Sequence, residues 1–127
     1  MRVAVDTNAY ADAARGFERS MEVLRTAEEI ALPFVVLAEL RAGFSVGTRG
    51  AKNEAALTLF LQSPRVRVLY ADEQTTYHYA RLFAFLRKRG TPVPTNDLWI
   101  ASLVVQHDLI LLSSDAHFAR LPQLPRV

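Results

Sequence analysis

The sequence contains no cysteine among its 127 residues, which excludes a disulfide framework and a thiolate metal site. It also lacks long apolar runs, and the stretch Leu109-Ile110-Leu111-Leu112 is far too short to span a bilayer. No basic segment followed by a long apolar run opens the chain, so no signal peptide is expected. These absences fit a reducing compartment, and we expect a soluble, cytoplasmic protein that does not enter a membrane.

An excess of charge of one sign is also missing. Fifteen Lys and Arg residues face thirteen Asp and Glu residues, which gives a net charge of +2 and a pI of about 9.3. This balance permits a nucleic-acid partner but does not argue strongly for one. Half of the residues are apolar, so the chain can bury a substantial core and disorder is not expected. The length suits one domain that covers residues 1–127.

Apolar strands alternate with amphipathic helices along the chain. Strands are predicted at residues 3–5, 30–32, 65–70 and 109–112, and helices at residues 9–15, 18–29, 33–44, 52–61, 73–89 and 95–106. The continuous run 109–112 is typical of a central strand buried on both faces, whereas 65–70 is expected nearer the sheet edge. Gly43, Gly47 and Gly50 mark a loop between two helices. The alternation predicts an α/β fold with three layers around a parallel sheet.

Two acidic residues directly follow predicted strands. Asp6 lies in Val5-Asp6-Thr7-Asn8 after the first strand, and Asp115 lies in Leu112-Ser113-Ser114-Asp115 after the last. Ligands of open parallel sheets bind beyond the carboxyl ends of the strands, so neighbouring strands would bring both acids together. The alternative interpretation is that Asp6 or Thr7 only caps the next helix.

Two further acids occupy positions from which they can reach the same crevice. Asp97 opens the helix 95–106, and Glu39 lies in the otherwise apolar helix 33–44. From the helix alone, a solvated outer position is favoured for Glu39.

Carboxylates that cluster repel one another, and a hard divalent cation such as Mg²⁺ or Mn²⁺ resolves the repulsion because it prefers oxygen ligands. Five polar residues beside the acids are candidates to orient carboxylates or waters, namely Thr7, Asn8, Thr95, Asn96 and Ser113.

In their order along the chain, these motifs resemble a PIN domain, and within that superfamily a VapC-type toxin of a type II toxin–antitoxin system. The matching segments are residues 5–8, 36–43, 95–101 and 112–118, so the resemblance covers nearly the whole chain. It implies a three-layer PIN-like domain with a central parallel sheet of four to five strands. Little sequence follows Leu124, which puts the last strand of that sheet in doubt.

The resemblance also implies an activity. A VapC-type toxin is a Mg²⁺- or Mn²⁺-dependent endoribonuclease, usually a homodimer, silenced by a small VapB-type antitoxin. Position by position, Asp6, Glu39, Asp97 and Asp115 would form its catalytic and metal-binding quartet. A metal-activated water would attack a phosphodiester of RNA, and Glu39 or Asp97 would help to deprotonate it. The number of ions and the role of Asp115 as a direct ligand stay open.

Basic residues offer candidates for contact with the RNA backbone. Arg41, Arg49 and Lys52 flank the glycine-containing loop, and phosphate contacts supply most of the affinity in such complexes. A solvated basic loop explains these three residues equally well. The cluster Arg87-Lys88-Arg89 ends a predicted helix, where cations favour the helix dipole, so it needs no nucleic acid as an explanation. The helical segment 34–61 is a hypothesis for the antitoxin groove.

The three histidines show no spacing typical of metal ligands or a catalytic triad. We interpret His78, His107 and His117 as ordinary, partly exposed residues, with His117 a weak site candidate because it lies near Asp115.

Two other functions compete with the ribonuclease hypothesis. A haloacid-dehalogenase-like phosphatase also begins with a strand and an Asp, but it needs a second Asp where this chain has Asn8. A non-catalytic PIN-like scaffold that binds RNA or a partner is the second alternative, and an intact acidic quartet argues against it. A dinucleotide-binding module is disfavoured because no Gly-rich turn follows the first strand.

Overall fold

The computed structural model describes residues 1–127 and contains a four-stranded parallel sheet. Its strands are β1 (Arg2–Val5), β2 (Glu29–Pro33), β3 (Val66–Leu69) and β4 (Ile110–Leu112), in the order β3-β2-β1-β4. Every neighbouring pair is parallel, which confirms the predicted sheet. None of the helices is long and apolar enough to cross a membrane.

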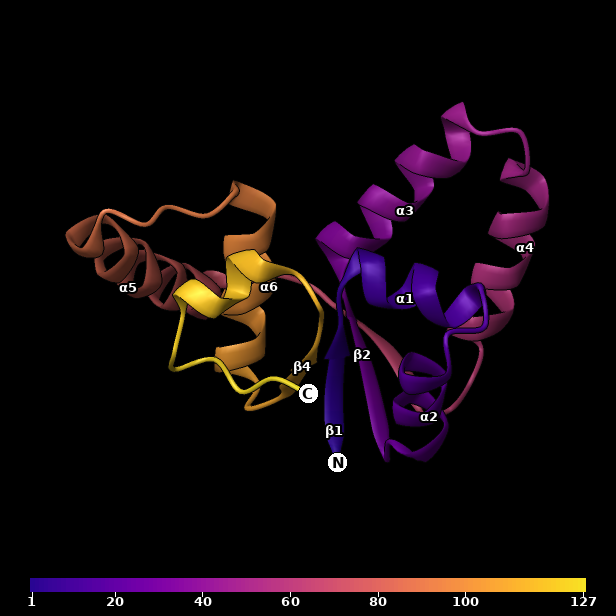
Figure 1. Cartoon of the computed structure of the whole chain (residues 1–127), viewed down its shortest axis with the longest axis horizontal. Coiled ribbons are helices and arrows are strands. Elements are labelled where there is room, and N and C mark those ends of the chain that lie inside the picture. The colour runs from indigo at the N-terminus through magenta and orange to yellow at the C-terminus, as the bar shows by residue number, and fades with distance from the viewer.

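Helices cover both faces of this sheet, as the three-layer prediction requires (Figure 1). Helices α1 (Thr7–Ala14), α2 (Glu18–Thr26), α3 (Phe34–Val46) and α4 (Gly50–Leu61) lie on one side. Helices α5 (Glu73–Arg89) and α6 (Thr95–Gln106) lie on the other, together with the short 3₁₀ helix η1 (Ala116–Arg120). Helix α5 ends at Gly90, whose φ of 66° lies in the left-handed region that glycine adopts without strain.

The core lies between the sheet and the helices on its two faces. Val3, Ala4 and Val5 of β1 have no solvent-accessible surface, as expected of a strand that is covered on both faces. Ile100 and Leu103 of α6 and Phe118 of η1 are also fully buried. The burial of these side chains holds β1, α6 and η1 in place, and the polar residues at the sheet edge are attached to these elements.

The predicted boundary between the second helix and the second strand is wrong. Helix α2 ends at Thr26, and Glu29, expected at the end of this helix, begins β2. Two tertiary interactions override the helical pattern. The carboxylate of Glu29 pairs with Arg2 at 2.7 Å and with Arg67 on the neighbouring strands, and the guanidinium of Arg65 donates to the carbonyl oxygens of Leu24 and Ala27.

The glycine-rich loop is shorter than predicted. Helix α3 continues through Gly43 to Val46, and Gly50 already belongs to α4, so only residues 47–49 connect the two helices. Helix α1 begins at Thr7 rather than at residue 9, because the side chain of Asp6 caps it.

Strand β4 is not central, contrary to the prediction. It lies at one end of the four-stranded order, beside β1. The chain terminus covers its outer edge: Leu111 donates to the Pro125 carbonyl at 2.8 Å, and Val127 donates to the Leu111 carbonyl at 2.9 Å. A single bridge between Leu111 and Arg126 is all that remains of a fifth strand. This backbone pairing explains why the apolar run 109–112 is buried although it forms an outer strand.

Candidate active site

The acids gather at the carboxyl edge of the sheet, where β1 and β4 end side by side. Val5 pairs with Leu112 in the parallel register, so the polar segments that follow these residues leave the sheet at the same edge. A cavity of about 120 Å³ opens there, and all four members of the predicted quartet line it. Its lining residues are Asp6, Thr7, Asn8, Glu39, Asp97, Ile100 and Asp115.

Asp6 both caps a helix and lines this cavity. Its Oδ1 atom accepts the backbone N–H of Ala9 at 2.8 Å, and its Oδ2 atom accepts the hydroxyl of Ser113. The residue is only 4% exposed. Burial raises the pKa of the Asp6 carboxyl, and the charges of Asp115 and Asp97 raise it further, although the two hydrogen bonds oppose the shift. Asp6 is therefore both the cap of α1 and a residue of the candidate site.

Glu39 faces the cavity rather than the outer surface of α3. The hydroxyl of Thr7 donates to its Oε1 atom at 2.6 Å, and the amide of Asn96 donates to its Oε2 atom at 3.5 Å. These partners come from α1 and α6, so one half-buried carboxylate connects three helices. The outer position that the helix pattern favoured is wrong.

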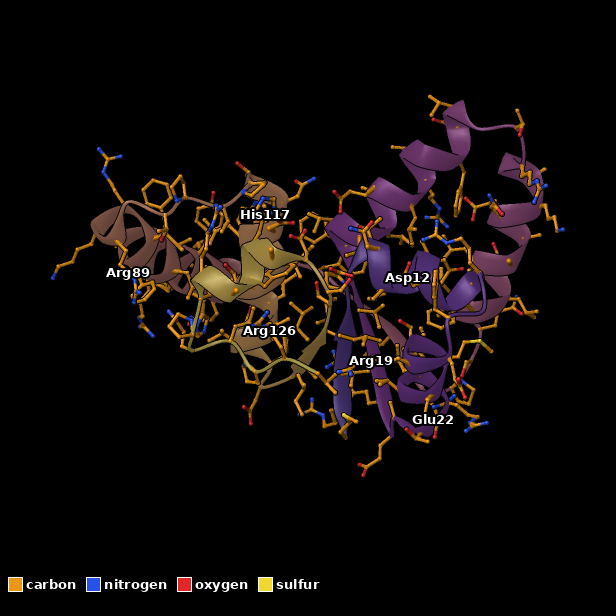
Figure 2. The ribbon with its side chains drawn as sticks, viewed as in Figure 1. Asp12, Arg19, Glu22, Arg89, His117 and Arg126 are labelled. Atoms are coloured by element: carbon orange, nitrogen blue, oxygen red, sulfur yellow. The ribbon has the colours of Figure 1, made fainter.

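Asp97 and Asp115 meet across the imidazole of His117. The Nδ1 atom of His117 lies 3.0 Å from Asp97 Oδ2 and 3.2 Å from Asp115 Oδ1, and its backbone N–H donates to Asp115 Oδ1 at 2.9 Å. Burial raises the pKa of Asp97, and the nearby charge of Asp115 adds to the shift. Figure 2 shows His117 on η1, above the sheet edge.

His117 is the site residue that sequence reasoning undervalued. The spacing of His117 fits neither a metal-ligand pattern nor a catalytic-triad pattern. The available signal was its place in Asp115-Ala116-His117, because a turn that presents one side chain to a site also brings the residue two positions later back towards it. In the structure Asp115 caps η1 by accepting from the N–H of His117, which confirms that the two residues form one turn.

The other predicted site residues differ in how they meet the cavity. Ser113 donates to Asp6 and accepts from the backbone N–H of Asp115 at 3.0 Å. Asn8 lines the cavity directly. Thr95 is the exposed first residue of α6, and its hydroxyl has no hydrogen-bond partner within the chain.

None of the three predicted RNA-contacting residues lines this cavity. Arg41 pairs with Glu54, at 2.9 Å from its Nε atom, whereas Arg49 and Lys52 are exposed and form no ion pair.

The donor set fits a divalent metal ion. One ligand atom from each of Asp97, Asp115 and His117 lies within 4.8 Å of the others, and the Asp6 carboxylate shares the cavity with the two aspartates. Burial is the main cause that raises the pKa values of Asp6 and Asp97, and the charges of neighbouring carboxylates add to both shifts. A dication with oxygen ligands would stabilise the ionised forms of these carboxylates.

The sheet order, its helices and the acids at its carboxyl edge define an α/β domain with an acidic cleft whose donor set fits a divalent metal ion. The chain matches the PIN domain family over residues 3–124 and belongs to it. It is similar to Ribonuclease VapC2 of Rickettsia felis, with 29% identity over 85% of this chain and 80% of that protein. It is 31% identical to Ribonuclease VapC1 of Haemophilus influenzae strain R2866, over 76% of this chain and 72% of that protein.

A solved structure extends this similarity to three dimensions. The crystal structure of VapBC2 from Rickettsia felis bound to a DNA fragment from their promoter matches with a TM-score of 0.85. The match covers 100% of this chain and 98% of the other chain, at 27% sequence identity. The resemblance to VapC-type PIN domains is therefore confirmed in both sequence and fold.

Proposed function

We propose that this chain is a metal-dependent endoribonuclease toxin of a VapBC-type toxin–antitoxin pair. One observation carries the proposal. Four acids that are far apart in the sequence line a single cavity at the sheet edge, in a chain whose relatives are named Ribonuclease VapC. Burial, together with the charges of neighbouring carboxylates, raises the pKa values of Asp6 and Asp97 and so disfavours their ionised forms. A scaffold that only bound a partner would not require such a cluster of acids.

Each site residue has a distinct role in the proposed reaction. Asp6, Asp97 and Asp115 would hold Mg²⁺ or Mn²⁺, and Ser113 and His117 keep these carboxylates in place. Such an ion would supply activation of the attacking water and stabilisation of the departing oxygen of the phosphodiester. Glu39 accepts the proton of that water, because its Oε2 atom is engaged only by the long contact with Asn96.

The RNA backbone requires cations beyond the acidic cavity. Arg49 and Lys52 are available for phosphate contacts because they are exposed and form no ion pair. Arg41 would first have to leave Glu54, so we rank it third among the predicted contacts.

The antitoxin is proposed to bind the largest apolar cavity of the chain. This cavity has a volume of about 450 Å³ and is lined by residues of α1, α2 and α4, including Tyr10, Met21, Ala56 and Phe60. It overlaps the predicted segment 34–61 only through α4, so α1 and α2 have to be added to the hypothesis. We expect Ala56→Glu to abolish co-purification with the co-expressed VapB-type antitoxin while RNA cleavage persists. Co-purification that survives this change would contradict the assignment.

We also propose that the toxin acts as a homodimer, as the family resemblance implies. Light scattering of the purified chain tests this directly, and a monomeric mass at micromolar concentration would contradict it.

Cleavage of a mixed cellular RNA pool tests the central proposal. We expect the wild type to cleave RNA with Mg²⁺ or Mn²⁺, to stop in EDTA, and to lose activity when Asp6 is changed to Asn. Asp72→Asn is the matched control, because Asp72 caps α5 as Asp6 caps α1 but lies outside the cavity. Equal cleavage by wild type and Asp6→Asn would indicate a contaminating nuclease.

A folded wild type that fails to bind Mn²⁺ would refute the metal centre and favour the scaffold hypothesis. Hydrolysis of a generic phosphate ester without cleavage of RNA would favour a phosphatase instead.

A further inference from the structure

Positive charge is concentrated in one segment of the chain. Residues 74–96 contain Arg81, Arg87, Lys88 and Arg89 and no acidic residue. Residues 1–73, by contrast, contain nine Lys and Arg residues and ten Asp and Glu residues. The small net charge of the whole protein therefore hides a strongly basic α5 beside a nearly neutral remainder.

These four cations are not engaged by acids. All four side chains are exposed, and none forms an ion pair within the chain. Five other arginines do form ion pairs with nearby carboxylates. The helix dipole accounts for cations in the last turn only, and Arg81 lies about two turns earlier. The charge of α5 thus exceeds what helix stability requires.

Aromatic surface accompanies this charge. Tyr77 and Phe83 of α5 are 59% and 48% exposed, although aromatic side chains of this size are usually buried. Phe83 also lines a cavity of about 310 Å³ with Arg87, Pro92 and Val93. Cations interleaved with exposed aromatic rings are the combination that binds single-stranded nucleic acid, since phosphates meet the cations and bases stack on the rings.

The same segment leads into the active site. Residues 90–94 connect the basic end of α5 to α6, whose first turn carries Asp97. The guanidinium of Arg120, on η1, donates to the carbonyl of Pro92, so the helix that carries His117 contacts this connection. Figure 2 shows Arg89 at the end of α5 remote from the sheet, with His117 between that end and β1.

Asp97 lies eight positions after Arg89, and a segment of that length spans at most about 28 Å. A single RNA strand therefore can contact both places.

We propose that Phe83, Arg87, Lys88 and Arg89, at the end of α5, form a second RNA-binding surface, the α5 surface, which holds single-stranded RNA beside the cleavage site. Arg87 follows Phe83 by one helical turn and lines the same cavity. The phosphates lie along the three cations, and one base stacks on Phe83. The inference rests on the proposed ribonuclease function for its biological meaning, but RNA binding to the α5 surface needs no cleavage.

Salt-dependent binding tests the α5 surface separately from catalysis. The probe is a fluorescein-labelled 20-nucleotide single-stranded RNA, measured by anisotropy in EDTA, where a metal-dependent enzyme leaves it intact. We expect R87Q/K88Q/R89Q to reduce the slope of log K against log salt by about 2, because each lost phosphate contact on a single strand removes about 0.7. Between 50 and 200 mM salt, the wild type should then lose about 20-fold more affinity than the variant.

The matched control is R15Q/R19Q/R25Q, which removes the same charge from α2 and from the turn between α1 and α2. Figure 2 shows Arg19 on this other part of the molecule. We expect this control to leave the slope close to that of the wild type. An equal decrease in both variants would indicate a general effect of net charge and overturn the proposal.

Phe83→Leu tests the stacking contact while it keeps an apolar side chain against Tyr79. We expect binding of the single strand to weaken at least about fivefold, with the salt slope unchanged. Unchanged affinity would refute the base contact. A change in oligomeric mass without a change in RNA binding, for either α5 variant, would instead assign this face to a second copy of the chain and overturn the RNA assignment.

Discussion

Replacement of Asp6 by Asn should stabilise the metal-free protein although it abolishes the proposed activity. Asp6 is 4% exposed, and burial is the main reason why its pKa lies above the ordinary value. Its ionised form therefore opposes folding. A buried ion costs several kcal/mol, whereas the change from a charged to a neutral acceptor weakens each of its two hydrogen bonds by only about 1 kcal/mol. Asn also remains a good helix cap.

The net gain is about 1–2 kcal/mol at pH 7. For a chain of 127 residues, an unfolding entropy of about 2.1 cal/mol/K per residue converts each kcal/mol into about 4 °C. Thermal unfolding in EDTA should therefore show a Tm about 4–7 °C higher for Asp6→Asn. Folding raises the pKa of Asp6 above its value of about 3.9 in the unfolded chain. The higher Tm of Asp6→Asn should therefore be fully present above the pKa of Asp6 in the folded protein, and it should disappear as the pH falls to about 3.9.

With Mn²⁺ present, the Tm of the wild type should rise more than that of Asp6→Asn. A ligand at tenfold its Kd stabilises the wild type by about 1.4 kcal/mol, and Asp6→Asn should gain much less. The control Asp72→Asn should lower the Tm instead, because hydrogen bonds from Gln106 and Thr75 hold the pKa of Asp72 below its ordinary value. A lower Tm for Asp6→Asn in EDTA would show that Asp6 serves mainly as a cap and would refute the reasoning.

Three further changes test the supporting residues. Thr7→Val removes the hydroxyl that holds Glu39, and we expect kcat to fall about 10- to 100-fold while the Tm falls by only about 4 °C; normal turnover would dismiss this positioning role. His117→Ala should weaken Mn²⁺ binding about 10- to 100-fold in calorimetry, and equal affinity would exclude the imidazole from the centre. Burial, with Arg67 nearby, lowers the pKa of His107, so wild-type stability should decrease as the pH falls through about 6.5. His107→Gln should flatten this pH dependence of the Tm, and an identical profile would contradict it.

The sequence predicted the parts of the fold that depend on local pattern. Helix α6 was predicted at the residues where it occurs, because a stiff proline segment precedes it and an apolar stripe runs through it. The parallel sheet followed from the alternation of strands with helices, and the edge position of β3 followed from the alternating charged and apolar residues at 65–68. The α2–β2 boundary did not, because Glu29 leaves the helical pattern only to pair with arginines on two other strands.

The site was predictable for the acids that follow strands and less so for the others. The prediction that Asp6 and Asp115 lie together required only that β1 and β4 be neighbouring strands, and the structure confirms this pairing. The direction of Glu39 could not be derived from its own helix, because it depends on Thr7 and Asn96 from two other helices. The role of His117 depends on a short turn whose geometry has no periodic signal.

The bond between Ser113 and Asp6 joins residues 107 positions apart, and this separation decides when the centre can form. A ribosome that releases about 5–20 residues each second finishes the first three strands well before it supplies β4. Until that last strand docks beside β1, Asp6 has no hydroxyl partner and Asp115 is absent from the sheet edge. A nascent or truncated chain therefore lacks part of the proposed cleavage centre until β4 has docked.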